Sequence, residues 1–209
     1  MKKRILVICL FLGSCTAFAE QSGFFIGIGA GVQGMSRETE MNILVTTAIE
    51  ESSGRGGSVS LLLGYKNVSD EKSGTRVYLN YDYNSIEVAG SIENKQSQYE
   101  VVGLNADYLL NFSDSFGLFV GANVGVIKWG REIYSLLSSD GEEEWKLYAA
   151  AQAGLRGIFG ERKSHAIELA AKLPFTSTTI EYKSDLLGKM GETKLKQSYG
   201  VSVRYICTF

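Results

Sequence analysis

Few side chains in this chain could act in catalysis or bind a metal. His165 is the single histidine, so triad or general-base chemistry of that kind would depend on it. The three cysteines are Cys9, Cys15 and Cys207, and the first two lie in an N-terminal segment with the pattern of a leader. Cys207 would then be alone, and one thiol forms neither an internal disulfide nor a tetrahedral cysteine site.

Two further motifs have a plainer interpretation than a ligand site. Gly27, Gly29 and Gly31 suggest a phosphate-binding loop, but the spacing is not G-x-G-x-x-G and no helical pattern follows. Asp140 and the acidic run 142–144 could attract a cation, although such runs are typical of solvated loops. The sequence therefore predicts no metal and no cofactor.

The N-terminus predicts export. Lys2, Lys3 and Arg4 precede the apolar run 5–12, and Ala17-Phe18-Ala19 has the small-x-small pattern of a cleavage site. We therefore expect a signal peptide at 1–19 and one domain at 20–209, with lipoprotein processing at Cys15 as the open alternative. Without the leader the chain carries 18 basic and 23 acidic residues, and this balance argues against nucleic-acid binding.

Eight segments of the mature chain have apolar residues at every second position, which predicts β-strands with one apolar and one mostly polar face. The apolar stripes begin at Phe24, Val59, Val77, Val102, Leu118, Leu147, Ile167 and Tyr199. Each is close to the ~10 residues that a tilted strand needs to cross a bilayer. No mature segment is apolar for the ~20 residues of a membrane-spanning helix.

The connections between these segments alternate in length. Residues 67–74, 113–115 and 160–164 are short, whereas 34–56, 85–98, 130–144 and 176–197 are long and polar. This alternation favours an all-β fold, an eight-stranded antiparallel up-and-down transmembrane barrel with four long external loops. A soluble lipocalin-type barrel is the alternative. Aromatic residues at both ends of the stripes favour the membrane barrel, because they mark the two membrane interfaces.

The opposite face of the predicted strands is polar, which would be unfavourable in a dry soluble core. It carries Arg76, Asn80, Asp82, Asn105, Asp107, Asn123, Gln152, Arg156, Glu168, Lys172 and Arg204. Hairpins closed at 160–164 and at 112–116 would place Arg156 opposite Glu168, Gln152 opposite Lys172, and Asn105 opposite Asn123. We expect an ionic network that fills the lumen, with inward glycines leaving room for large side chains. A narrow pore through the same residues is the alternative.

The last eleven residues alternate strictly and end in an aromatic residue. Tyr199, Val201, Val203, Tyr205, Cys207 and Phe209 share one face, on which Cys207 would be a small apolar group facing lipid. This strand resembles the terminal strand of bacterial outer-membrane barrels, in which such a pattern is read by the insertion machinery. The resemblance marks Tyr205, Cys207 and Phe209 as a terminal insertion signal.

Residues 20–31 together with the Phe209 terminus resemble small outer-membrane proteins of the Helicobacter and Campylobacter type, and more loosely the OmpA-like eight-stranded barrel. This resemblance implies residence in the outer membrane of a Gram-negative bacterium, as a monomer. It also implies three partners: membrane lipids with lipopolysaccharide, the barrel-insertion machinery, and a host-surface ligand.

The long loops are the expected site of function, because recognition residues usually stand on loops held by a rigid scaffold. Trp129, Tyr134, Trp145 and the apolar segment 41–49 are the loop residues expected to contact a partner. An enzyme is not expected, since His165 lies beside the short turn, whereas known barrel enzymes carry their catalytic groups toward the outer leaflet. The sequence thus favours a structural or adhesion-like role, ahead of a pore and of an outer-leaflet lipid-modifying enzyme.

Overall fold

The computed structural model describes residues 20, 22–43, 46–69, 72–88, 95–130, 145–160, 163–184 and 188–209. The predicted signal peptide, its alternative at Cys15, and Tyr134 lie outside these residues. The strands are β1 (Gly23–Ile43), β2 (Thr46–Val68), β3 (Ser73–Val88), β4 (Lys95–Ser113), β5 (Phe116–Trp129), β6 (Trp145–Phe159), β7 (His165–Pro174), β8 (Thr178–Ser184) and β9 (Gly188–Thr208). No helix in these ranges is long and apolar enough to cross a bilayer.

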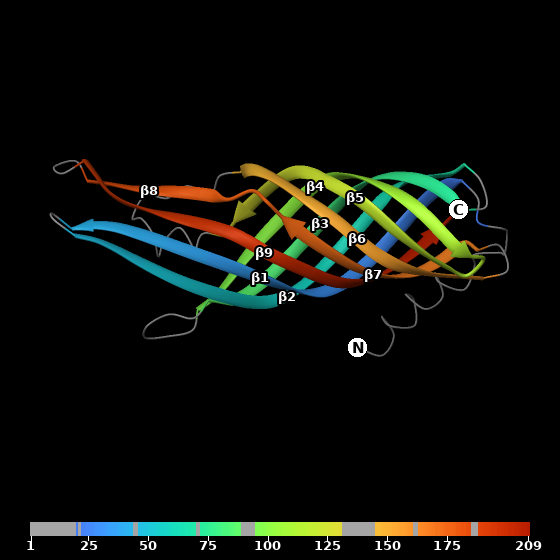
Figure 1. Ribbon diagram of the computed structural model, residues 1–209, viewed down its shortest axis with the longest axis horizontal. Coiled ribbons are helices and arrows are strands. Elements are labelled where there is room, and N and C mark those ends of the chain that lie inside the picture. The colour runs from blue at the N-terminus through green and yellow to red at the C-terminus, as the bar shows by residue number, and fades with distance from the viewer. Residues whose placement is uncertain are drawn as a thin grey trace, which may run out of the picture.

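Eight of these strands form a closed barrel. The order is β1-β2-β3-β4-β5-β6-β7-β9, all neighbours that we describe are antiparallel, and pairing of β1 with β9 closes the cylinder (Figure 1). At the seam Phe25 pairs with Thr208, and the backbone N–H of Phe209 donates to the carbonyl of Phe24 at 2.8 Å. The predicted eight-stranded up-and-down barrel is therefore confirmed.

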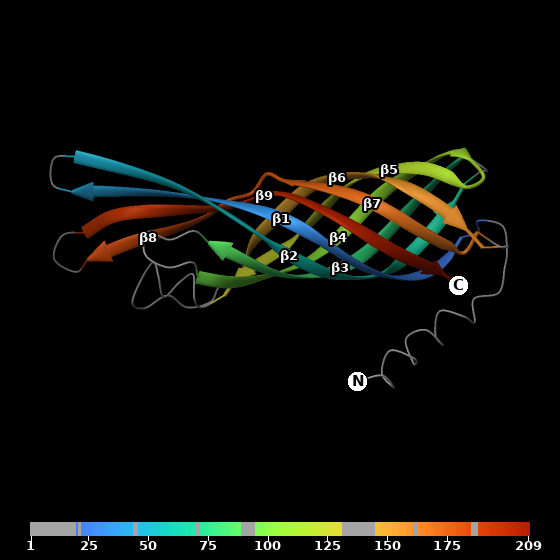
Figure 2. The ribbon, with the colours of Figure 1, turned by 90° about the horizontal axis from the view of Figure 1, so that it is seen from below.

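Two segments expected as long loops are strands instead. β1 and β2 continue to Ile43 and Thr46, and the predicted loop 176–197 contains β8 and the beginning of β9. Together they form a four-stranded extension, in the order β2-β1-β9-β8, that projects beyond the barrel (Figure 2). Alternation of apolar and polar residues cannot predict these strands. An apolar stripe reveals a strand in the sequence only where one face of the sheet is buried, and a projecting sheet does not need one.

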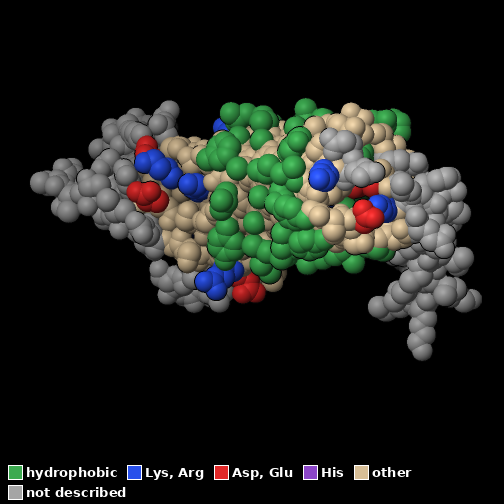
Figure 3. Space-filling view, turned by 45° about the vertical axis from the view of Figure 1, so that its right-hand side comes forward, with side chains coloured by type: hydrophobic (Ala, Val, Ile, Leu, Met, Phe, Trp, Pro, Cys, Tyr) green, Lys and Arg blue, Asp and Glu red, His purple; other side chains and the backbone are tan. Residues whose placement is uncertain are grey.

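Apolar side chains cover the outside of the barrel. Ile28, Leu61, Leu79 and Val124 are 49–58% exposed, and Figure 3 shows the belt of hydrophobic side chains to which such residues belong. The inward residues of the same strands are buried and largely polar. This arrangement is the reverse of a soluble barrel, so the lipocalin-type alternative is wrong and the apolar face is the one that meets lipid.

The registers predicted from the two hairpins are confirmed. Arg156 pairs with Glu168 and Gln152 with Lys172 between β6 and β7, and Asn105 pairs with Asn123 between β4 and β5. The β4–β5 hairpin has an irregularity between Asn111 and Ser113 rather than the expected Phe112–Phe116 pair. This local shift leaves the pairing of the inward residues unchanged.

Candidate functional site

The lumen brings together the side chains expected from the polar face. Ten of the eleven residues expected on the polar face are buried at 8% exposure or less: Arg76, Asn80, Asn105, Asp107, Asn123, Gln152, Arg156, Glu168, Lys172 and Arg204. The eleventh, Asp82, has a side chain that is 14% exposed. Their position follows from strand alternation, since every second residue of each strand points inward.

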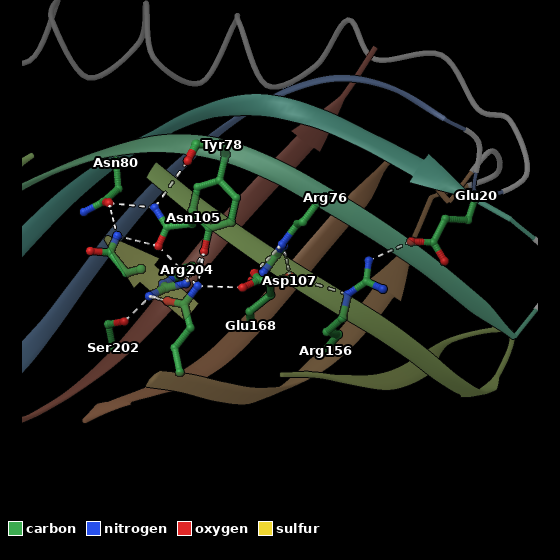
Figure 4. A network of polar contacts seen from close by, with 12 residues as sticks. Glu20, Arg76, Tyr78, Asn80, Asn105, Asp107, Arg156, Glu168, Ser202 and Arg204 are labelled. Atoms are coloured by element: carbon green, nitrogen blue, oxygen red, sulfur yellow. Dashed lines mark hydrogen bonds and ion pairs between the residues drawn. The ribbon is translucent and has the colours of Figure 1, made fainter. Parts of the chain in front are cut away.

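An alternating chain of charges runs along the part of the lumen nearest the short turns, and its hydrogen bonds and ion pairs are drawn in Figure 4. Arg76 Nε donates to Asp107 Oδ2 at 2.8 Å, and its two terminal nitrogens donate to the Glu168 carboxylate at 2.6 and 3.0 Å. Arg156 Nη2 and Lys66 Nζ then donate to Glu20 Oε1 at 2.6 and 3.2 Å. Three positive groups face three negative groups, so the chain of six residues is formally neutral.

The pairing of Glu168 differs from the expectation. Arg156 is its register partner, but Arg156 Nε lies 3.4 Å from Glu168 Oε1 and makes no hydrogen bond there. The bidentate hydrogen bonds to Glu168 come from Arg76 across the lumen. β3 and β7 are not neighbours in the sheet, so no strand register could have predicted this pair.

Aromatic rings enclose the central guanidinium. The Arg76 side chain lies 4.7 Å from the ring centroid of Phe119, 5.2 Å from that of Tyr78 and 5.9 Å from that of Phe25. Aromatic faces attract a cation that has left water, so these rings stabilise the buried charge. They also occupy the width of the lumen beside it.

An amide layer lies next to this centre. Asn105 Nδ2 and Asn123 Nδ2 both donate to Asn80 Oδ1 at 2.7 Å. Gln152 Nε2 donates to Asp107 Oδ1 at 2.6 Å, which links the amides to the charged chain. The amide groups therefore continue one connected hydrogen-bond network across the strands.

Near the outer end the lumen is polar and nearly filled. Lys172 Nζ donates to Asp82 Oδ2 at 2.7 Å. Beside this pair lies a cavity of about 30 Å³, to which Gln33 and Arg204 also contribute. A water molecule needs roughly 10–15 Å³ measured in this way, so the cavity has room for about two waters.

An apolar cluster fills the lumen beyond that cavity. This cluster was not predicted from the sequence. It consists of Met35, Ile86, Tyr99, Val101, Ile127, Trp129, Tyr148, Ala150 and Leu195, all at 3% exposure or less. The sequence did contain a sign of this cluster. Alternation places Ile86 and Ile127 on the same inward face as the polar residues of their strands. Met35, Ile86 and Leu195 fall in segments predicted as loops, and for these three residues that prediction is wrong.

The aromatic residues expected in the loops have different environments. Trp129 is 1% exposed, its ring centroid lies 4.7 Å from that of Tyr99, and its Nε1 donates to Thr178 Oγ1 at 3.0 Å. Its proposed contact with a partner is therefore wrong, because it ends β5 inside the apolar cluster. Trp145 begins β6 and is 48% exposed, so it remains accessible.

At the opposite end, His165 and the terminal strand form an aromatic stack. Tyr205 OH and His165 Nδ1 are 2.7 Å apart, and the Phe159 ring stacks on the imidazole at 5.5 Å. Phe209 is 67% exposed, whereas Cys207 is only 6% exposed. Cys207 shares the parity of the outward face but is covered, so its expected exposure to lipid is wrong. In the described ranges, no group of three or more His, Cys, Asp or Glu residues could hold a metal.

Glu20 closes the network at the turn end, and the sequence analysis gave it no role. Its carboxylate accepts hydrogen bonds from Arg156, Lys66 and Asn111. Burial raises the pKa of Glu20, but the neighbouring Arg156 and Lys66 charges outweigh this, so the pKa lies below its usual 4.5. Because the pKa of Glu20 is lower in the folded than in the unfolded state, the ionised carboxylate stabilises the fold above the unfolded-state pKa. This stabilisation is lost as pH falls through the folded-state pKa.

We therefore expect Glu20→Gln to lower the free energy of unfolding at pH 7 by roughly 2 kcal/mol, the contribution of hydrogen bonds to a charged group. The difference from the wild type should shrink as pH falls from about 4.5 through the lower folded-state pKa of Glu20, because the wild-type side chain becomes protonated, and so neutral like glutamine, over that range. Urea unfolding in lipid vesicles at pH 3–7 measures this. A constant difference over the whole range would show that the Glu20 charge contributes nothing.

Comparisons with known proteins agree with this architecture. OprG of Pseudomonas aeruginosa matches with a TM-score of 0.55 and 12% identity, over 93% of this chain and 98% of that one. The outer-membrane protein AlkL matches with a TM-score of 0.51 and 14% identity, over 94% and 95%. No curated protein matches the sequence. At these identities the two structures establish the fold alone.

A family model described as "Helicobacter outer membrane protein" matches residues 60–209. The match runs from β2 to the last residue and so includes most of the barrel wall and the terminal strand. It agrees with the family resemblance of the strand that ends in Phe209, and it places the protein in the outer membrane. The chain belongs to the Helicobacter outer membrane protein family.

Proposed function

We propose that this outer-membrane barrel acts in surface interaction, through the strands that project beyond the barrel, and that it does not conduct. The observation that best supports this proposal is the filled lumen. Within the described residues the ionic chain, the aromatic rings, the amide layer and the apolar cluster follow one another from Glu20 to Leu195. A closed lumen leaves the outer surface as the place where the protein can act.

The four-stranded extension supports this role. β1 and β9 remain paired as far as Met41 and Gly191, well past the end of β7 at Pro174. In the described part of the chain β8 ends the strand order. The edge of a projecting sheet can bind an extended segment of a partner through backbone hydrogen bonds. A host-surface ligand of protein type would fit this mode.

Shortening the extension tests the proposal. Arg37 pairs with Ser52, and Thr179 pairs with Lys194. Joining each pair by Asn-Gly, which favours a tight hairpin, removes the two projecting hairpins and leaves the barrel strands intact. We expect normal heat-modifiable gel mobility but at least tenfold fewer cells bound to host cell layers.

A narrow pore is the second candidate, supported by the polar cavity beside Lys172 and Asp82. Uptake of small solutes by the same strains separates the two functions. Unaltered cell binding with altered uptake would overturn the proposed role and favour the pore.

A further inference from the structure

A groove lies on the outer wall of the barrel, on the opposite side of the strands from the lumen. The residues along it include Val32, Arg55, Gly57, Glu87, Gln96 and Tyr199, and its volume is about 590 Å³. These residues come from five adjacent strands, β9, β1, β2, β3 and β4. Gln33 and Gly56 also line the groove, and Gln33 lines the lumen cavity beside Lys172 and Asp82 as well.

Strand register arranges the polar groups of the groove in one row. Tyr199 pairs with Gly34, Gly34 with Arg55, Arg55 with Glu87, and Glu87 with Gln96. The row therefore holds an aromatic ring, a guanidinium, a carboxylate and an amide side by side on the outward face. In the neighbouring row Val32 pairs with Gly57 and Gly57 with Ser85.

Two glycines shape the groove in different ways, since Gly57 lines it and Gly34 lies under the Tyr199 ring. A Cβ on Gly34 would lie 2.4 Å from the Tyr199 ring, so this glycine lets the ring lie against the wall. A Cβ on Gly57 would lie 4.0 Å from the nearest neighbouring atom, the Gly31 carbonyl oxygen. Packing within the chain therefore does not require a glycine at position 57, and its absent side chain leaves space for another molecule.

The height of the groove above the turn end of the barrel indicates which kind of molecule would bind in it. Gly34 stands ten residues after Phe24, an exposed aromatic at the turn end of β1. At about 3.3 Å per residue and a tilt of about 40°, Gly34 lies roughly 25 Å above Phe24, the thickness of the apolar band of such barrels. Val32 and Val201, just below, are still apolar and exposed. The groove therefore begins where acyl chains end and headgroups start.

We propose that the groove binds a sugar ring in the headgroup of an outer-leaflet glycolipid such as lipopolysaccharide. The Tyr199 ring offers an apolar face for the C–H side of a sugar, as aromatic side chains with one apolar and one wet end do at interfaces. Glu87, Gln96 and Arg55 supply acceptors and donors for hydroxyl groups, and Arg55 suits a phosphate on the sugar. The acyl chains of the same lipid would lie along Val32 and the apolar stripe below.

Filling the groove is the direct test. Gly57→Leu places a side chain in the space, and its Cβ would lie 4.0 Å from the Gly31 carbonyl oxygen. Gly157→Leu is the matched control, because Gly157 is an outward position near the turn end whose Cβ would also be unobstructed, 3.8 Å from the Ile167 carbonyl oxygen. The full-length barrels, refolded in neutral phosphocholine micelles and checked by heat-modifiable mobility, are titrated with rough lipopolysaccharide that retains its inner-core sugars.

We expect Gly57→Leu to raise the Kd at least tenfold, Glu87→Gln to raise it severalfold, and Gly157→Leu to leave it unchanged. Equal affinity of Gly57→Leu and Gly157→Leu would overturn the proposal. So would equally tight binding of phosphatidylglycerol, which carries charge without a sugar ring, since it would reveal a merely anionic surface. Free core oligosaccharide binding as tightly as the lipid form would overturn the assignment to a membrane glycolipid.

Discussion

Replacing Glu168 by Ala is expected to lower the free energy of unfolding by about 3–5 kcal/mol, the usual cost of breaking one side of a buried ion pair. Glu168 is fully buried and receives two hydrogen bonds from Arg76, with Arg156 also 3.4 Å away. Its removal leaves both guanidinium groups in the lumen with one carboxylate fewer. Urea unfolding in lipid vesicles, followed by the fluorescence of Trp129 and Trp145, measures the loss.

Double-mutant cycles distinguish the two candidate partners of Glu168. The coupling with Arg76 should be large, because the pair is bidentate, whereas the coupling with Arg156 should be much smaller. Asp114→Ala is the control, since Asp114 meets Lys163 at the surface with its own side chain 91% exposed, and such pairs contribute little. Additive effects of Arg76 and Glu168 substitutions would contradict the network described here.

Gly154→Leu is expected to prevent assembly of the barrel. A Cβ at Gly154 would lie 2.3 Å from the carbonyl oxygen of Leu169 and 2.5 Å from the Phe119 ring. The backbone of the neighbouring strand cannot move by the necessary distance without breaking the β6–β7 ladder, and overpacking of this kind is strongly destabilising. Folded protein in the membrane, measured by heat-modifiable mobility, should fall at least tenfold.

Gly157→Leu in the same strand is the control for this change. It adds the same side chain three residues away, on the outward face, where the new Cβ would lie 3.8 Å from the Ile167 carbonyl oxygen. We expect it to assemble like the wild type. Normal assembly of Gly154→Leu would show that Phe119 does not fill the lumen beside that glycine.

The sequence was sufficient to predict the features that depend on neighbouring strands. Alternation identified the inward and outward faces, and turn positions gave the register that sets Arg156 opposite Glu168. The sequence pattern could not predict the Arg76–Glu168 hydrogen bonds, because this contact crosses the lumen between two strands that are not adjacent in the sheet. Glu20 was missed for the same reason, since its partners come from β2, β4 and β6.

The projecting extension and the apolar cluster were missed for a different reason. Segments 34–56 and 176–197 were interpreted as loops because they are polar, although β-pairing in water needs no apolar stripe. This interpretation also makes Trp129 a loop residue, whereas in the structure its ring packs against Tyr99 under the extension. The roles of Tyr205 and Phe209 in insertion and of Trp145 in partner contact stay predictions.

The central claim is that the lumen is closed, and planar-bilayer conductance tests it most directly. The wild-type barrel should give no steady channel current at neutral pH, whereas a general porin inserted into a separate bilayer, as the positive control, should conduct. This is expected because the 30 Å³ cavity near Lys172 lies between the ionic network and the apolar cluster. A steady, ion-selective current from the wild type, altered by Lys172→Ala or Arg204→Ala, would contradict the account and make the protein a narrow pore.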